Sequence, residues 1–427
     1  MHSPTNTLRT LSTAAIMLAV AGALPSISRA GGLALYEIGS PDVGAASAGF
    51  AARAGDPSTV FSNPAGLTLL PGTQVMLGIQ PMYGQVTFSV EQTTNTGGNG
   101  ENAIGFIPGG SMFLSHQLDD HWSIGFGVCS YFGLAENYDD DWAGRYYIQN
   151  ASLVGLSLLP SVAYRVNDQL SLGAGLNAMM ASFSTDVAVN NLTPGMSDGQ
   201  LHLEDSCWGF GANLGVLYQF DKGTRLGVTY LSPVDLSFDA ETKFYNLGPG
   251  LSGLLERRDL QSVQLDMTVP QMVMASIYHE LDDQWAIMGN VGWQQWSQFG
   301  EVEVSVTSAN PKSLTTSLDY QDTWHGAFGV QYKPEPQWKF TTGLAYDSSM
   351  IKDENRTVTL PVDAAWRWGI GTQYELSKAV TLGLAYELIY FGDMSVNQQG
   401  GPLRGSISGT YDSAMFHVVA LSLNWKM

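Results

Sequence analysis

The sequence has few positive charges and few cysteines, and both shortages exclude classes of protein. Nineteen lysine and arginine residues stand against 39 aspartate and glutamate residues, which gives a formal net charge of −20. A nucleic-acid-binding protein needs a basic surface to meet phosphates, so the composition argues against that class of partner. Only Cys129 and Cys207 occur. They lie in separate predicted strands, and we expect them to be free thiols.

The chain also lacks the residue patterns of common enzymes and metal sites. Its seven histidines are scattered, with no HExxH motif and no paired zinc-ligand spacing. Residues 195–199 match the G-x-S-x-G pattern around Ser197. A nucleophile elbow needs a strand before it and a helix after it, whereas this match lies in a loop rich in Gly and Asn. The sequence therefore predicts a protein that is not an enzyme, with no metal and no cofactor.

A long hydrophobic run is missing everywhere except near the N-terminus. Arg9, the apolar residues 11–24 and the small-residue sequence Ser28-Arg29-Ala30 are typical of a secretory signal peptide, predicted over residues 1–30. The apolar stretch is shorter than the ~20 residues of a transmembrane helix, and no later apolar run reaches about 18 residues. The sequence therefore predicts an exported protein, in which a disulfide is possible.

A linker is missing as well, since no Pro- or Ser-rich stretch divides the rest of the chain. A chain of this length with many strands is then a large β-solenoid or sandwich, or one closed membrane barrel. Short polar turns followed by strict alternation of large apolar and small residues recur, as in Trp122, Ile124, Phe126 and Val128 after Leu118-Asp119-Asp120. Similar turns occur near Asp168, Asp221, Asp282, Pro334 and Ser377.

Longer polar connections alternate with the six short turns. They are predicted at residues 92–103, 136–144, 190–204, 239–260, 305–312, 350–362 and 395–410. Thirteen connections join fourteen strands. An even number of strands places both barrel ends on one side, with the short turns facing the periplasm and the long loops facing outside.

A soluble sheet protein also shows alternation, but two features favour the membrane. Trp122, Trp285 and Trp338 follow short turns closely, where an aromatic girdle belongs. The opposite face is mainly Gly, Ser, Thr and Asn, which are too small and polar for a close-packed core. The sequence therefore predicts an all-β fold, a 14-stranded antiparallel transmembrane β-barrel over residues 73–427. We expect a monomer among the lipids and lipopolysaccharide of a Gram-negative outer membrane.

Residues 31–72 do not follow the strand pattern. Within residues 56–66, two prolines and a glycine break any helix or strand ladder, while Asp56 and Asn63 can hold tight turns by bonding nearby backbone N–H groups. Irregular backbone needs polar partners. We therefore expect this segment inside the barrel lumen, as an N-terminal hatch.

Part of this segment is similar to the hatch motif of the FadL family of outer-membrane transporters. The matching residues are Gly49-Phe50-Ala51-Ala52, followed by Asp56 and Asn63-Pro64-Ala65. Residues 293–297 and 343–347 resemble later strands of that family. The resemblance covers nearly the whole mature chain. It implies passive transport of long-chain fatty acids, which are captured by apolar surface among the external loops and passed to a pocket in the barrel. The hatch then rearranges, and the ligand leaves laterally beside a kinked strand.

Three groups of residues are candidates for this function, each with a plainer structural alternative. Hatch gating is assigned to Asp56, Asn63, Pro64 and Ala65, which can equally be structural. Ligand capture is assigned to Leu247, Leu251, Leu254 and Leu255, at helical spacing, with Arg257 and Arg258 for a carboxylate. The alternatives are a helix packed on its own barrel and a solvated pair of arginines. The lateral gap is assigned to Phe132 and Gly133, or to an ordinary strand end.

Other functions remain open at this stage. The same fold can take up aromatic or aliphatic hydrocarbons instead of fatty acids. A structural or adhesive surface barrel is a third hypothesis, from another class of function.

Overall fold

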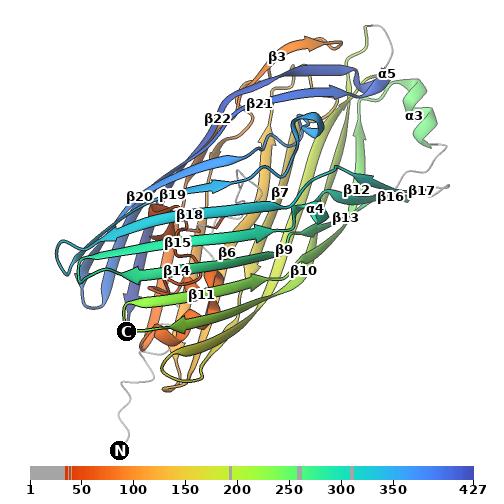
Figure 1. The fold of residues 1–427 in the computed structure, drawn as a ribbon. Helices are drawn as coiled ribbons and strands as arrows, with labels where there is room; N and C mark the ends of the chain where they lie inside the picture. Colours follow the sequence, from red (N-terminus) through yellow and green to blue (C-terminus); the bar gives the residue numbers. More distant parts are fainter. Residues whose placement is uncertain (1–33, 37, 40, 192–194, 257–261, 308–311) are drawn as a thin grey trace, which may run out of the picture.

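The computed structural model describes residues 34–427 except residues 37, 40, 192–194, 257–261 and 308–311. The predicted signal peptide, residues 1–30, lies outside the described residues. The strands form one antiparallel sheet that closes on itself, because β1 (Thr73–Ile79) pairs with β22 (Ser406–Lys426), with Val75 opposite Trp425. The predicted barrel is confirmed (Figure 1).

Fourteen wall strands are built from 22 strand segments in the described part of the chain, because seven wall strands are interrupted. The first seven wall strands are β1 with β2 (Met82–Gln85) and β3 (Phe88–Thr93); β4 (Gly105–Ile107) with β5 (Gly110–Gln117); β6 (Trp122–Asn137); β7 (Asn150–Leu158) with β8 (Ser161–Arg165); β9 (Leu170–Val189); β10 (Gly199–Gln219); and β11 (Thr224–Leu231) with β12 (Val234–Tyr245). The last seven are β13 (Ser262–Val269) with β14 (Met272–Glu280); β15 (Trp285–Gln294) with β16 (Glu301–Thr307); β17 (Lys312–Ser317) with β18 (Thr323–Tyr332); β19 (Trp338–Asp347); β20 (Ala365–Ser377); β21 (Val380–Gln399); and β22.

The six predicted short turns are confirmed, but four predicted loops are shorter than expected. The connections expected at residues 190–204, 239–260, 305–312 and 395–410 span 190–198, 246–261, 308–311 and 400–405, because β10, β12, β16, β21 and β22 continue into them. Strands that project beyond the bilayer need no apolar lipid-facing residues, so their sequences look like polar loops. Short helices lie in three external connections: α3 (Pro249–Glu256), η3 (Asp353–Asn355) and α5 (Gly401–Arg404). The helix α4 (Trp296–Phe299) lies in the interruption between β15 and β16.

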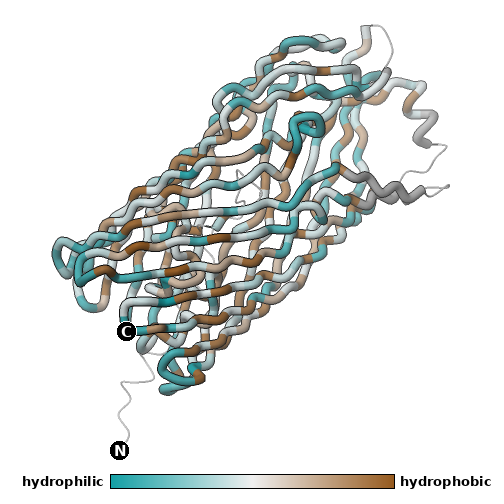
Figure 2. Tube along the Cα trace, in the orientation of Figure 1, coloured by the Kyte–Doolittle hydropathy of each residue, from teal (hydrophilic) through white to brown (hydrophobic). Residues whose placement is uncertain are grey.

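Large apolar side chains face outward from the barrel. Trp122, Trp285 and Trp338 are 44%, 41% and 37% exposed, at the short-turn end where the girdle was predicted. The buried inner face carries small polar residues such as Ser115 and Asn213. Figure 2 shows hydrophilic residues gathered at the turns and apolar residues distributed along the strands. None of the described helices is long and apolar enough to cross a membrane.

Cys129 is buried in β6 and Cys207 is half-buried in β10, and both are free thiols. The expectation that they do not pair is confirmed.

The segment before β1 lies inside the barrel. Its described residues form two 3₁₀ helices, η1 (Pro41–Ala45) and η2 (Pro64–Leu69), and the short α-helix α2 (Thr59–Ser62). In Figure 1 this orange segment coils within the wall near the short turns. Nearly all of its described residues are buried, so the segment is ordered but irregular, as the prolines and glycines predicted. We keep the name hatch for these residues, 34–72.

Candidate functional site

Asn63 ties the turn at the centre of the hatch to itself and to the barrel wall. Its Oδ1 accepts a hydrogen bond from the backbone N–H of Ala65 at 3.1 Å. Its Nδ2 donates to the backbone oxygen of Ala51 at 2.6 Å and to that of Val216, in β10, at 3.1 Å. Asn63 is almost completely buried. These bonds therefore satisfy polar atoms that water does not reach, and they hold the hatch against β10.

Asp56 holds a second turn through a buried ion pair. Its Oδ1 accepts hydrogen bonds from the backbone N–H and the hydroxyl of Ser58 at 3.1 and 2.5 Å. Arg53 Nη1 lies 2.9 Å from Asp56 Oδ2, and Arg53 Nε lies 2.5 Å from Asp42 Oδ1. Burial by itself raises the pKa of the Asp56 carboxyl, but the charge of Arg53 and the bonds from Ser58 hold that pKa below its ordinary value.

Glycines on the inner wall make room for the backbone of the hatch. Gly173 of β9 and Gly215 of β10 are paired across the two strands. A Cβ on Gly215 would lie 1.9 Å from Asn63 Oδ1, and one on Gly173 would lie 2.2 Å from the backbone N of Ala65. The same close approach of hatch backbone to wall occurs at Gly78, Gly227, Gly343 and Gly369. The sequence pattern predicted small lumen-facing residues, but not which of them meet the hatch.

The first described residues of the hatch bind the edge of β6. Ala34 forms an antiparallel bridge with Phe132, and the backbone N–H of Leu35 donates to the backbone oxygen of Tyr131 at 2.8 Å. The pairing of β5 with β6 ends at Ser111 and Cys129. The hatch therefore supplies a backbone partner just beyond the point where β5 and β6 separate.

The sequence assigned a lateral gap to Phe132 and Gly133. The structure places both in the middle of β6, not at a strand end, and directly after an irregularity. The register between β6 and β7 shifts between Cys129 and Phe132. Such a bulge bends a strand and re-aims its side chains. Phe132 is fully buried and contacts Trp296 and Phe299, with ring centroids 6.4 and 5.7 Å apart.

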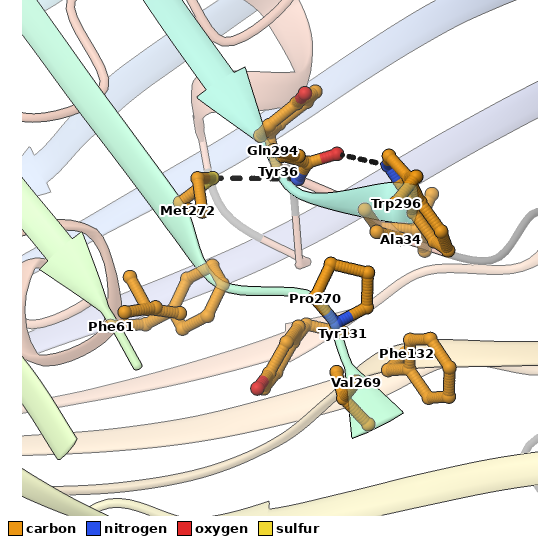
Figure 3. Close-up of a pocket in the computed structure, with 12 residues that line it drawn as sticks. Ala34, Tyr36, Phe61, Tyr131, Phe132, Val269, Pro270, Met272, Gln294 and Trp296 are labelled. Carbon is orange, nitrogen blue, oxygen red and sulfur yellow. Dashed lines mark hydrogen bonds between the residues drawn. The ribbon is translucent and has the colours of Figure 1, made fainter. Parts of the chain in front are cut away.

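An apolar pocket lies between this part of the hatch and the barrel wall (Figure 3). The space is small and partly open to solvent. Its polar groups bond to one another: Trp296 Nε1 donates to Gln294 Oε1 at 2.8 Å, and Gln294 Nε2 contacts Met272 Sδ at 3.5 Å. The lining residues are Ala34, Leu35, Tyr36, Phe61, Tyr131, Phe132, Leu231, Val269, Pro270, Met272, Gln294 and Trp296.

The pocket coincides with interruptions in three neighbouring wall strands and with the bulge in β6. Pro270 separates β13 from β14, Trp296 follows the end of β15, Leu231 ends β11, and Phe132 follows the bulge in β6. Sequence reasoning assigned only Phe132 to the site. Pro270 could have pointed to the other pocket residues, because a proline inside a strand pattern marks a break in the hydrogen-bond ladder of the sheet.

Tyr36 connects the pocket to a charged network in the wall. Its ring lies 4.4 Å from that of His325, and the guanidinium of Arg367 lies 5.2 Å from its centroid. Asp347 joins these two residues, with Oδ1 2.7 Å from His325 Nδ1 and Oδ2 2.6 Å from Arg367 Nε. Ser47 Oγ of the hatch lies 3.1 Å from His325 Nε2. The hatch is therefore anchored at two points on this network.

The predicted capture residues lie apart from the pocket, in the external connection between β12 and β13. Leu251 is half-buried in α3, and Leu247 precedes that helix. Leu254 and Leu255 fall within α3, which supports their helical spacing, but their side chains are outside the description. Arg257 and Arg258 lie outside the described residues.

Comparison with known proteins identifies similar chains over nearly the full length. A family model described as "Outer membrane protein transport protein (OMPP1/FadL/TodX)" matches residues 21–426. The chain is 27% identical over 432 residues to a "Long-chain fatty acid transport protein" of Escherichia coli strain K12, covering 92% of this chain and 95% of that protein.

Solved structures share the fold at lower sequence identity. A FadL homologue from Pseudomonas aeruginosa aligns with a TM-score of 0.84 and 20% identity, covering 92% of this chain and 99% of that one. A toluene transporter, TodX of P. putida, aligns with a TM-score of 0.64 and 18% identity, covering 94% and 100%. Both likenesses support the architecture of the barrel.

Proposed function

Since this chain belongs to the family of outer membrane protein transport proteins, OMPP1/FadL/TodX, we propose that it carries long-chain fatty acids passively across the outer membrane. It is an outer-membrane β-barrel transporter of that family, whose members are transporters and channels. The choice of fatty acids is supported by the E. coli relative, which is similar over 92% of this chain.

The apolar pocket is the observation that carries this proposal. A methylene group gains about 0.8 kcal/mol when it leaves water for an apolar environment, so the lining of this pocket favours an alkyl chain over a hydrophilic solute. The hatch occupies the lumen beside it, with most of its residues buried. This arrangement favours a carrier of hydrophobic molecules over an open pore for hydrophilic ones.

We infer a route in three steps. The ligand is captured at the external surface that includes Leu247 and Leu251, with Leu254, Leu255, Arg257 and Arg258 as further candidates. It then enters the pocket and displaces the hatch residues Ala34–Tyr36, whose hydrogen bond to Tyr131 closes the edge of β6. Exit beside Phe132 and Gly133, into the membrane, completes the route. The turn at Asp56 and Asn63-Pro64-Ala65 keeps the remaining hatch attached to the wall.

Aromatic or aliphatic hydrocarbons are the second candidate substrates, and one observation favours them. None of the twelve described residues that line the pocket is charged. A carboxylate bound there has no cationic partner in the lining, whereas a hydrocarbon needs none. The similarity to a toluene transporter supports the same alternative.

Uptake of labelled oleate and labelled toluene, by cells that lack their own importer, tests the function. We expect oleate uptake that depends on this chain. Toluene uptake alone would transfer the proposal to hydrocarbons. A variant without residues 63–65, assembled at the same level in the outer membrane, is the control for the role of the hatch. If neither compound enters the cells, transport of these two substrate classes is contradicted. The hypothesis of a structural or adhesive surface protein is then favoured.

A further inference from the structure

We propose that Glu136 is a hydrogen-bonding anchor for the headgroup of an uncharged amphiphile, so that the substrates of this barrel include fatty alcohols and protonated fatty acids. The inference deepens the proposed transport function and rests on it. It names a polar contact on the ligand path that the apolar pocket itself does not provide.

Glu136 is buried without a partner for its carboxyl group. It is the next-to-last residue of β6 and only 3% exposed. Neither Oε1 nor Oε2 has a hydrogen-bond partner among the described residues. Burying an unpaired carboxylate is costly, and so is leaving the donor and acceptors of a protonated carboxyl unmet. The carboxyl of Glu136 can therefore form hydrogen bonds with a partner that the described residues do not supply.

The position of Glu136 aims it toward the ligand path. Side chains two residues apart share one face of a strand, so Phe132, Leu134 and Glu136 face the same way. Phe132 lines the pocket, and Leu134 belongs to the same apolar cluster as Phe299. Phe299 in turn stacks on Tyr320 at 6.4 Å. Beyond Leu134, Glu136 therefore continues the row of side chains that leads from the pocket toward the external end of β6.

Two phenols at the external end of this region are already engaged. Tyr138 directly follows β6, and Tyr411 lies in β22. The hydroxyls of Tyr138 and Tyr411 lie 2.6 Å apart, and both bond to the backbone oxygen of Val358, at 3.0 and 3.1 Å. These two hydroxyls therefore bond to each other and to Val358, and neither bonds to the carboxyl of Glu136.

The spacing along β6 suits an amphiphile of moderate length. Four residues separate Phe132 from Glu136, which is about 13 Å along a strand. An alkyl tail in the pocket can thus place its headgroup at the carboxyl. Because β6 leads from the short turn at 118–121 to an external loop, an incoming ligand meets Glu136 before it meets the pocket.

The chemistry of a carboxyl selects among headgroups. A protonated Glu136 donates one hydrogen bond and accepts others, and an ionised one accepts only. A hydroxyl or a protonated acid can pair with it in either state. A carboxylate anion is repelled by an ionised Glu136, and two carboxyl groups at one site favour retention of a proton. The anchor therefore favours the uncharged form of an acidic ligand.

The test compares labelled 1-decanol with labelled n-decane, which have the same number of carbon atoms and differ by one hydroxyl. We expect Glu136→Leu to lower decanol uptake about tenfold, as the loss of one buried hydrogen bond implies, and to leave decane uptake unchanged. Glu136→Gln retains a hydrogen-bonding group of the same shape and should keep most decanol uptake. Glu91→Leu, at an exposed position in β3, is the matched control.

Two results would overturn the anchor. The first is that an assembled Glu136→Leu barrel takes up decanol at the wild-type level. The second is that Glu136→Leu loses decane and decanol uptake equally, which indicates a purely structural role. Infrared spectra of the purified protein decide the case if Glu136→Leu does not assemble. We expect a carboxyl band that is absent from Glu136→Gln and that decanol shifts but decane does not. If wild-type cells take up neither compound, the anchor proposal fails, whereas the transport proposal is judged separately by the uptake of oleate and toluene.

Discussion

At the scale of single residues, the fit of the hatch depends on missing side chains as much as on present ones. Asn63 reaches the backbone of β10 only because Gly215 leaves space beside its amide. Gly173, across from it, does the same for Ala65. A larger side chain at Gly215 or Gly173 would collide with the hydrogen-bonded side chain of Asn63 or with the hatch backbone at Ala65. Close-packed atoms of this kind cannot move aside easily.

Gly215→Val should therefore displace the central turn of the hatch while the barrel still assembles. The added side chain meets Asn63 and Pro64, and overpacking of this kind costs roughly 1–3 kcal/mol or more. We expect raised permeability to a large hydrophilic antibiotic, measured as increased sensitivity of the cells. Gly326→Ala is the control, since a Cβ there meets nothing within 4 Å. Wild-type resistance in Gly215→Val would contradict the fit described here.

The ion pair of Asp56 and Arg53 makes the hatch sensitive to acid. Because the pKa of folded Asp56 is lowered, its stabilising contribution is present above the unfolded pKa of about 3.9. The contribution is lost as the pH falls through the lower, folded pKa. We expect hydrogen-exchange protection of the hatch, corrected for intrinsic rates, to be higher at pH 7 than under strongly acidic conditions.

Asp56→Asn tests this assignment at neutral pH. Removing one member of a buried pair costs about 3–5 kcal/mol, so the variant should lose hatch protection at pH 7. The difference between variant and wild type should disappear in strong acid, where Asp56 is protonated in both the folded and the unfolded chain. Equal protection of the two proteins at pH 7 would count against the ion pair.

At the scale of the element, β6 has a bulge, an edge that pairs with the hatch beyond the end of β5, and one side of the apolar pocket. Its pairing with β5 ends at Cys129, its register with β7 shifts before Phe132, and the hatch bonds to it at Tyr131. Irregular strands of this kind commonly occur beside functional sites. The hatch segment is thus the backbone partner of β6 at a point where its pairing with β5 has ended.

Leu35→Pro removes the N–H that bonds to Tyr131. One net hydrogen bond is worth about 1 kcal/mol, so the released form of the segment should be populated about fivefold more. We expect faster uptake of a hydrophobic fluorescent probe. Leu35→Ala, which keeps the N–H, is the control for the loss of the side chain. Uptake by Leu35→Pro that matches Leu35→Ala would show that this bond does not limit entry.

At the scale of the whole molecule, the outer surface sets the stability of the barrel in the membrane. Leu344, in the middle of β19, is half exposed on the outside, whereas Leu376 lies at the short-turn end of β20. A cation costs most at the midplane of the bilayer and little at its edge.

Leu344→Arg should therefore destabilise the barrel by about 2–4 kcal/mol, and Leu376→Arg by about 0–1 kcal/mol. Denaturant-induced unfolding in lipid vesicles measures both free energies. The two variants share the same chemical change, so the comparison isolates depth in the membrane. Similar losses for the two would contradict the placement of β19 across the bilayer.

The sequence by itself determined the class of the fold, the number of wall strands and the periplasmic turns. These features follow from local patterns: alternation along each strand, polar turns between them and tryptophans beside the turns. It also located the hatch, because prolines and glycines forbid regular structure locally. The lengths predicted for four external connections were wrong, since strand residues outside the bilayer carry no apolar signature.

Only the tertiary structure decided which distant residues meet. The register of the closed barrel sets the pairing of Gly173 with Gly215 and the bond from Leu35 to Tyr131. It also sets the pocket, which lies beside three strand interruptions and the bulge in β6. Glu136 became a candidate in the same way. A glutamate near a strand end is ordinary in sequence, and only the packing of the loops and strands around it shows that its carboxyl is buried and unpaired among the described residues. Register and closure are properties of the whole sheet, so no local pattern can specify them.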